Sequence, residues 1–236
     1  AAYTAVDKAE SEPELAMAVN GIAPGIMAEE AKRLGAAMIH YSTDYVFDGT
    51  KTTPYTEEDV PNPINVYGKT KLAGELAIQA VGVPYLILRT SWVYGMRGRN
   101  FLLTILRLAK ERDELRIVGD QFGAPTWSRM IAEVTSQILA QSFSQLAAIK
   151  GIYNLTATGE TSWFGFTQTI LDIHSSRSPV HVPVGPKVFS IATSEYPLPA
   201  PRPLYSVMSN NKMHHTFGIR IPLWKDSLAL CMDGEE

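Results

Sequence analysis

Two short apolar runs without polar alternation constrain the fold more than any other feature of this sequence. They cover residues 36–41 and 84–89, and a helical pattern over about 66–81 lies between them. Strands that helices bury on both faces are continuously apolar, whereas half-exposed strands alternate between apolar and polar residues. The order strand, helix, strand therefore predicts an α/β fold with a parallel sheet.

Polar side chains follow the first apolar run, and two reactive groups begin the helix. Ser42, Thr43 and Asp44 come directly after the run, and Tyr67 and Lys71 lie in the first turns of the helix. Residues four apart share a helix face. An ammonium beside a phenol favours the phenolate and lowers its pKa from about 10. We therefore expect Tyr67 to give a proton to a carbonyl under reduction, with Thr43 bonded to the same oxygen.

The pair of Tyr67 and Lys71 is weak evidence by itself, because a solvated helix start with a half-buried tyrosine gives the same pattern. Its context is more specific. A strand, Ser-Thr-Asp, a loop and Tyr-x-x-x-Lys at a helix start resemble the extended short-chain dehydrogenase/reductase superfamily. That superfamily uses a Ser or Thr, a Tyr and a Lys in catalysis. The resemblance implies that Thr43, Tyr67 and Lys71 are the catalytic set.

Further blocks narrow the resemblance to the dTDP-4-dehydrorhamnose reductase branch. They cover residues 1–10, 42–49, 89–95 and 120–126, followed by Arg202-Pro203 and Ser206, in the order that the branch shows. The resemblance implies a Rossmann-like parallel sheet with a smaller mixed α/β domain. It also implies that NADPH or NADH reduces the C4 keto group of dTDP-4-dehydro-6-deoxy-L-mannose, which gives dTDP-L-rhamnose for cell-surface polysaccharides.

The same resemblance implies the remaining site contacts. Lys71 would lower the pKa of Tyr67 and hold the ribose of the nicotinamide. The residues expected along the cofactor are Ala1, Ala2, Tyr3, Ser42, Tyr67 and Lys71. The residues expected on the substrate side are Val6, Asp7, Thr43, Asp44, Trp92, Asn100 and Arg202.

Four of these residues also have ordinary structural interpretations. Trp92 fits a core position, Asn100 fits a helix N-cap, and Asp44 fits a turn cap. Arg202 could brace a polar loop instead of holding a diphosphate through its guanidinium. The residues leave these alternatives open, and the resemblance favours the ligand contacts.

The beginning of the sequence lacks a feature that a complete dinucleotide-binding fold has. Residues 1–4 resemble a loop after a strand, and we find no Gly-x-Gly-x-x-Gly or Gly-x-x-Gly-x-x-Gly. Gly21 and Gly25 follow no strand, so we reject them as phosphate binders. Compared with the family, the first strands of the sheet are expected to be missing. The choice between NADPH and NADH stays open, because the residue that reads the ribose 2′ position would lie there.

The resemblance predicts two domains, with the active site between them. Residues 1–95 would form the second half of the cofactor domain, and residues 96–236 would add a sheet strand and the sugar-nucleotide domain. Ser11 and Glu14 fit a capping box, and Pro24 should break the helical region or restart it. The segment after residue 175 is rich in proline and should be extended and irregular. The other expected helices cover about 11–20, 25–34, 100–112, 127–143, 162–174, 210–217 and 224–232, and the other strands 115–118 and 151–156.

The amino-acid composition limits which binding partners and which cellular compartment we expect. The chain has 236 residues, 45% of them hydrophobic and 19% charged, with a net charge of −3, so nothing indicates a surface for nucleic acid or acidic membranes. Its single cysteine, Cys231, fits a reducing cytoplasm, and no membrane span or signal peptide is visible. His214-His215 lacks accompanying ligands, so we expect no metal site. A homodimer is the one protein assembly that we consider.

Two other functions stay open. A non-catalytic regulatory relative would fit the absent glycine-rich turn, although the retained Thr43, Tyr67 and Lys71 indicate chemistry. A sugar-nucleotide epimerase or dehydratase of the same superfamily is the second alternative. Dehydratases carry an Asp-Glu pair beside the threonine, whereas Tyr45 follows Asp44 here.

Overall fold

A three-stranded parallel sheet lies at the centre of the computed structural model, which describes residues 2–142, 145–176 and 185–233. Its strands, in spatial order, are β1 (Met38–Thr43), β2 (Tyr85–Thr90) and β7 (Gly151–Asn154). Both neighbouring pairs are parallel, with Thr43 opposite Thr90 and Arg89 opposite Asn154. The predicted α/β class with a parallel sheet is confirmed.

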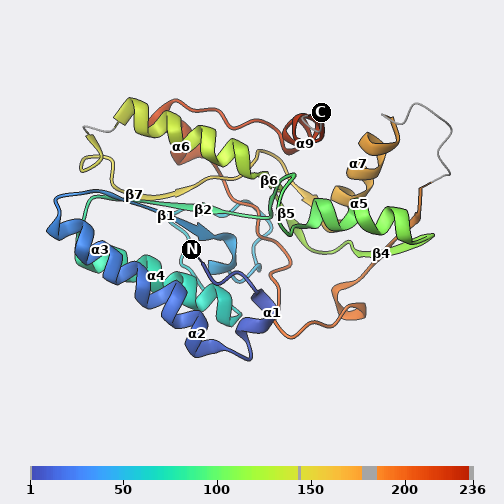
Figure 1. Cartoon of the computed structure of the whole chain (residues 1–236), viewed down its shortest axis with the longest axis horizontal. Coiled ribbons are helices and arrows are strands. Elements are labelled where there is room, and N and C mark those ends of the chain that lie inside the picture. The colour runs from blue at the N-terminus through green and yellow to red at the C-terminus, as the bar shows by residue number, and fades with distance from the viewer. Residues whose placement is uncertain (1, 143–144, 177–184, 234–236) are drawn as a thin grey trace.

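Helices cover both faces of this sheet (Figure 1). On one face lie α3 (Ala23–Arg33) and α4 (Val66–Val81), and on the other lies α6 (Ser128–Ser142). Successive residues of β2 serve the two cores: Ile87 packs with the α3 and α4 side chains, and Leu88 packs into the larger cluster on the opposite face. Burial on both faces explains why β2 shows no polar alternation.

The first strand differs from its prediction. It begins at Met38 rather than at residue 36, and both Ala36 and Ala37 are exposed. In the described sheet β1 is an outer strand, since only β2 pairs with it. The Tyr41 side chain is therefore 43% exposed, and only Ser42 and Thr43 are buried. The expectation of a fully buried strand over residues 36–41 was wrong.

The expected capping box at the start of the chain is absent. Two short helices, α1 (Val6–Ala9) and α2 (Pro13–Met17), come first, and α2 has no side-chain cap. The Ser11 hydroxyl instead donates to the Lys8 carbonyl at 3.0 Å. Because this bond closes the end of α1, the hydroxyl does not cap α2.

Pro24 does not break the helical path, but a new α-helix starts beside it, which is the restart that the sequence analysis allowed. A π-helical turn, η1 (Ala18–Ile22), precedes it, and α3 already begins at Ala23. A proline ring inside an α-helix clashes with the carbonyl four residues earlier. The wider π turn accommodates the ring, so the chain continues as a helix.

A second group of elements packs beside the sheet. Helices α5 (Phe101–Glu111) and α7 (Trp163–Ser176) pack together next to a parallel pair, β4 (Glu114–Val118) and β9 (Lys187–Ile191). The proline-rich segment was expected to be mostly extended and irregular, and within it the extended strand β9 pairs with β4. The remaining elements are η2 (Asp44–Val46), β3 (Val93–Tyr94), β5 (Phe122–Gly123), β6 (Thr126–Trp127), β8 (Thr161–Ser162), η4 (Thr193–Glu195), α8 (Asn211–Phe217) and α9 (Trp224–Asp233). No helix in the described ranges is both long enough and apolar enough to span a bilayer.

Candidate active site

Thr43 and Asp44 lie together where β1 ends, at the edge of the sheet where open α/β folds bind ligands. The Thr43 hydroxyl donates to Asp44 Oδ1 at 3.1 Å and accepts the Tyr45 backbone N–H at 3.1 Å. Burial raises the pKa of Asp44 to about 6, although hydrogen bonds from Ser206 and Thr43 act in the opposite direction. The site thus holds a buried carboxyl group beside a hydroxyl.

Tyr67 faces the same group from the first turn of α4. Its ring makes an edge contact with the Tyr45 ring, with centroids 5.6 Å apart. Burial raises the pKa of Tyr67 to about 12, while a hydrogen bond with Thr43 lowers it by a smaller amount. The structure therefore brings Thr43, Asp44 and Tyr67 into one cluster, with Tyr67 in its protonated form.

Two residues that the sequence analysis did not single out hold the start of α4. Asn65 is the N-cap: its Oδ1 accepts the Gly68 N–H at 2.8 Å, and its Nδ2 donates to the Pro201 carbonyl at 2.9 Å. The Val66 N–H donates to Glu10 Oε1 at 2.8 Å. An asparagine just before a helical pattern is a cap signal that the sequence does contain. The Glu10 contact spans 56 residues and left no local signal.

Lys71 does not act on Tyr67 in the expected way. Its ammonium donates to the Tyr41 carbonyl at 2.6 Å and lies 3.1 Å from His40 Nε2. Burial lowers the pKa of Lys71 to about 8, against the opposing effect of the Glu75 carboxylate. The expected lowering of the Tyr67 pKa by Lys71 is not present here, because burial dominates and the ammonium bonds to β1. Sharing a helix face does not by itself join the two groups.

A buried ion pair lies one turn further along α4. Arg89 of β2 donates through Nε and Nη2 to the two carboxylate oxygens of Glu75, at 3.0 and 2.7 Å. Both side chains are almost completely buried. The paired N–H groups of a guanidinium match a carboxylate, so this contact fixes the rotation of α4 against the sheet.

Asp7 and Arg202, two residues expected on the substrate side, bind each other. The Arg202 guanidinium donates to Asp7 Oδ1 at 3.0 Å and to Oδ2 at 2.8 Å. These bonds hold the pKa of Asp7 below its usual range. Val6 precedes Asp7 as the first residue of α1 and is half-buried. The structure thus brings three of the expected substrate residues to one place.

Trp92 lies in a constrained position beyond the end of β2. Its φ is 45°, the one positive value for a non-glycine residue among those described. Its ring stacks on that of Trp163, with centroids 3.4 Å apart and planes within 5°.

Asn100, another residue expected on the substrate side, caps α5, since its Oδ1 accepts the Leu103 N–H at 3.1 Å. The cap interpretation of Asn100 is what the hydrogen bonds show.

The residues expected along the cofactor are only partly described. Ala1 lies outside the described residues, and Ala2 is exposed. The Tyr3 backbone exchanges two hydrogen bonds with the Asn20 side chain, both at 2.9 Å. Ser42 is buried, and its hydroxyl has no hydrogen-bond partner within the described part of the chain.

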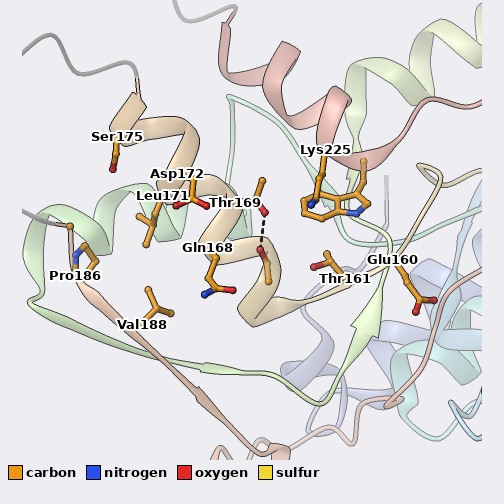
Figure 2. Close-up of a pocket in the computed structure, with 13 residues that line it drawn as sticks. Glu160, Thr161, Gln168, Thr169, Leu171, Asp172, Ser175, Pro186, Val188 and Lys225 are labelled. Carbon is orange, nitrogen blue, oxygen red and sulfur yellow. Dashed lines mark hydrogen bonds between the residues drawn. The ribbon is translucent and has the colours of Figure 1, made fainter.

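Several cavities lie outside this cluster, and two of them border α5 or α7. One of about 610 Å³ is lined by side chains of α5 and β4 together with Gln121, Trp163 and Arg202. Figure 2 shows another, of about 580 Å³, with Gln168 and Asp172 of α7 and Lys225 at the start of α9 around it. The first cavity includes a residue expected to bind substrate, and the second includes none. No group of three or more metal-ligating side chains occurs within the described ranges.

Comparison with known proteins gives consistent matches over nearly the whole chain. The sequence profile of the RmlD substrate binding domain matches residues 1–236. A dTDP-4-dehydrorhamnose reductase of Burkholderia thailandensis is 50% identical over 237 residues, which cover 98% of this chain and 79% of that protein. The crystal structure of a dTDP-4-dehydrorhamnose reductase from Clostridium acetobutylicum has a TM-score of 0.89 at 39% identity, covering 98% of this chain and 78% of the other. The Bacillus anthracis dTDP-4-dehydrorhamnose reductase in complex with NADP also gives 0.89, at 35% identity and the same coverage.

Proposed function

Because the chain belongs to the RmlD substrate-binding-domain family, we propose that it reduces the C4 keto group of dTDP-4-dehydro-6-deoxy-L-mannose to give dTDP-L-rhamnose. The enzyme is an NADPH-dependent oxidoreductase of nucleotide-sugar biosynthesis. The observation that carries the residue assignment is the cluster of Thr43 and Tyr67 where β1 ends. It places a phenol and a hydroxyl where one carbonyl oxygen can contact both.

The side chains near Lys71 fit a nicotinamide ribose. The Ser42 hydroxyl is buried without a hydrogen-bond partner in the described part of the chain. It follows His40 by two residues, so both side chains lie on the same face of β1, the face toward Lys71. An unpartnered hydroxyl and a buried ammonium are suited to the hydroxyl groups of a ribose. Ser42 and Lys71 would therefore hold the cofactor, which supplies the hydride.

In the proposed mechanism, Tyr67 is the general acid. Its phenol gives a proton to the C4 oxygen as that carbon receives the hydride, and a phenolate remains. Burial keeps the phenol protonated at neutral pH, since its pKa is about 12. The Thr43 hydroxyl, which donates to Asp44 Oδ1 in this structure, would turn to donate to the same oxygen and hold it in line with Tyr67. Lys71, whose ammonium bonds to β1, would serve this step by holding the cofactor ribose.

The substrate nucleotide would extend from Tyr67 toward Arg202. The 610 Å³ cavity combines aromatic side chains with the Arg202 guanidinium. That combination suits a pyrimidine ring attached to a diphosphate. Trp92, Asp7 and Val6 would lie along the sugar, and the division near residue 95 would separate cofactor contacts from nucleotide contacts.

Replacement of Tyr67 by Phe tests the proposal. The phenylalanine keeps the ring and removes the proton, so kcat should fall by about 10²- to 10⁴-fold. The NADPH affinity, measured by calorimetry, should stay within about twofold. Tyr85→Phe is the matched control, because Tyr85 lies at the opposite end of β2, away from Thr43.

Each outcome of this test has a clear meaning. A Tyr67→Phe protein with wild-type turnover would refute the role of Tyr67. A wild-type chain that binds NADPH but turns over no sugar would identify a non-catalytic relative. A nicotinamide that is recycled without net oxidation would indicate an epimerase or dehydratase, the alternatives left open above.

We also propose that the protein is a cytoplasmic homodimer with a small-molecule substrate. Large apolar side chains are exposed on neighbouring helices and favour a second copy as partner. They are Leu15, Ile22, Ile26, Met27 and Leu76. Sedimentation velocity should give twice the chain mass, and Ile26→Glu should give the monomer.

Cell fractionation should place the protein with its cofactor and nucleotide sugar in the cytoplasm.

A further inference from the structure

The ammonium of Lys71 is held by two consecutive residues of β1. It donates to the Tyr41 carbonyl at 2.6 Å and lies 3.1 Å from His40 Nε2. An ammonium has three N–H donors in a fixed tetrahedral arrangement. With two of them directed at β1, the direction of the third is determined. Tyr41 contributes only its backbone, so His40 is the side chain that sets this geometry.

His40 can accept this bond only while its imidazole is neutral and Nε2 carries no proton. Burial and the neighbouring Lys71 charge lower its pKa to about 3. Among the described residues, the other charges around the pair are Glu75 on α4, which raises the pKa of Lys71, and Arg89, which is bound to Glu75. Below about pH 8, where Lys71 is an ammonium and can only donate, the contact therefore requires the neutral His40 tautomer whose Nε2 accepts.

We propose that His40 is a positioning residue, which accepts a hydrogen bond from the Lys71 ammonium and fixes the direction of its remaining N–H, the one left for the cofactor ribose. The same bond favours the charged form of Lys71, since an acceptor stabilises an ammonium over an amine. This inference deepens the proposed function and rests on it for the role of Lys71 in turnover. The contact itself is independent of that function.

Two substitutions separate the hydrogen bond from the bulk of the side chain. His40→Phe keeps an aromatic ring and removes the acceptor, whereas His40→Gln keeps an acceptor near the position of Nε2. His215→Gln is the matched control, because His215 is exposed on α8. Thermal unfolding monitored by circular dichroism checks that each variant is folded.

The first measurement follows the Lys71 13Cε chemical shift against pH in the ligand-free protein, assigned through Lys71→Met. In the wild type the midpoint should lie near 8. His40→Phe should increase the acid dissociation constant of Lys71 about tenfold, the expected effect of a lost hydrogen bond to a charged group. His40→Gln should return it to within about twofold of the wild type, and His215→Gln should leave it unchanged.

The second measurement is the pH profile of turnover. In His40→Phe the alkaline limb of kcat should move down by the same factor, with the KM for the sugar nucleotide unchanged. An unchanged Lys71 midpoint in His40→Phe, or a His40→Gln protein as impaired as His40→Phe, would overturn the inference. If the midpoint moves while Tyr67→Phe retains full turnover, the His40 contact stands and the proposed function fails.

Discussion

Removing the charge of Glu75 should destabilise the protein more than any exposed charge substitution. Glu75 and Arg89 are 0% and 1% exposed, and two hydrogen bonds of 3.0 and 2.7 Å join them. In Glu75→Gln the guanidinium stays charged, because arginine does not lose its proton in proteins. One of its two donors then faces an amide N–H group instead of an oxygen.

The size of the expected loss in the free energy of unfolding follows from the burial of this ion pair. Breaking a buried ion pair by removing one partner costs about 3–5 kcal/mol, since the remaining charge is left uncompensated. The glutamine oxygen still accepts one hydrogen bond, which offsets about 1 kcal/mol. The expected loss is therefore about 3 kcal/mol, a large part of a typical domain stability of about 5–15 kcal/mol. With an m-value of about 3 kcal/mol/M, the urea midpoint should fall by about 1 M.

The assay is urea unfolding followed by circular dichroism, with two further variants. Glu133→Gln is the control: its partner is Arg129, at 2.8 Å on the exposed face of α6, and the change should stay within about 0.5 kcal/mol. The double variant Glu75→Gln/Arg89→Met removes the orphaned charge, so its loss should be smaller than the sum of the single losses by about 2 kcal/mol. A Glu75→Gln protein that loses less than about 1 kcal/mol, or strict additivity in the cycle, would refute the reasoning.

Two further predictions concern helix packing and acid stability. Gly74→Ala should lower the free energy of unfolding in urea by about 1–3 kcal/mol, because the new Cβ would clash with the Asn20 carbonyl oxygen. Gly25→Ala is the control and should cost less, because its new Cβ would meet only the Ala77 side chain, at 3.1 Å. His40 has a pKa of about 3 in the folded chain, below its ordinary 6.5, so protons bind preferentially to the unfolded chain and stability falls as the pH drops from 6.5 toward 3. The loss in free energy of unfolding that is attributable to His40 should reach about 2 kcal/mol at pH 5. In His40→Gln this contribution should be absent when the free energy of unfolding is measured against pH.

Local signals determined how well each element could be predicted. The helix that carries Tyr67 and Lys71 was predicted over residues 66–81 and extends over Val66–Val81. Its limits are local, because Asn65 caps its start and Gly82 adopts φ 72° at its end. In contrast, β9 depends on a partner strand about 70 residues away, and no property of the proline-rich segment encodes that pairing. β4 depends on the same distant pairing but was predicted, because its own residues are mostly apolar, whereas the proline-rich surroundings of β9 hide the strand.

In the candidate site, too, the sequence predicted which residue types occur but not which partners they contact. The sequence indicated a hydroxyl, a phenol and an ammonium in the right order, and their assignment as catalytic groups stays a prediction. It did not indicate that Lys71 would bond to His40 and Tyr41, because those contacts depend on how α4 packs against β1. Spacing along a helix identifies which side chains share a face, but burial and acceptors across the interface decide where an ammonium points.

The position of Tyr67 depends on three chain segments that hold one another. The start of α4 is bound to the N-terminal segment and to the loop around residue 201, and those two segments are bound to each other. The three contacts are Val66 to Glu10 at 2.8 Å, Asn65 to Pro201 at 2.9 Å, and Arg202 to Asp7 at 2.8 Å. Because the contacts form a closed triangle, a shift of any one segment strains the other two. A ligand that draws Arg202 away from Asp7 would therefore also act on the first turn of α4, which couples the proposed diphosphate contact to the proposed proton donor.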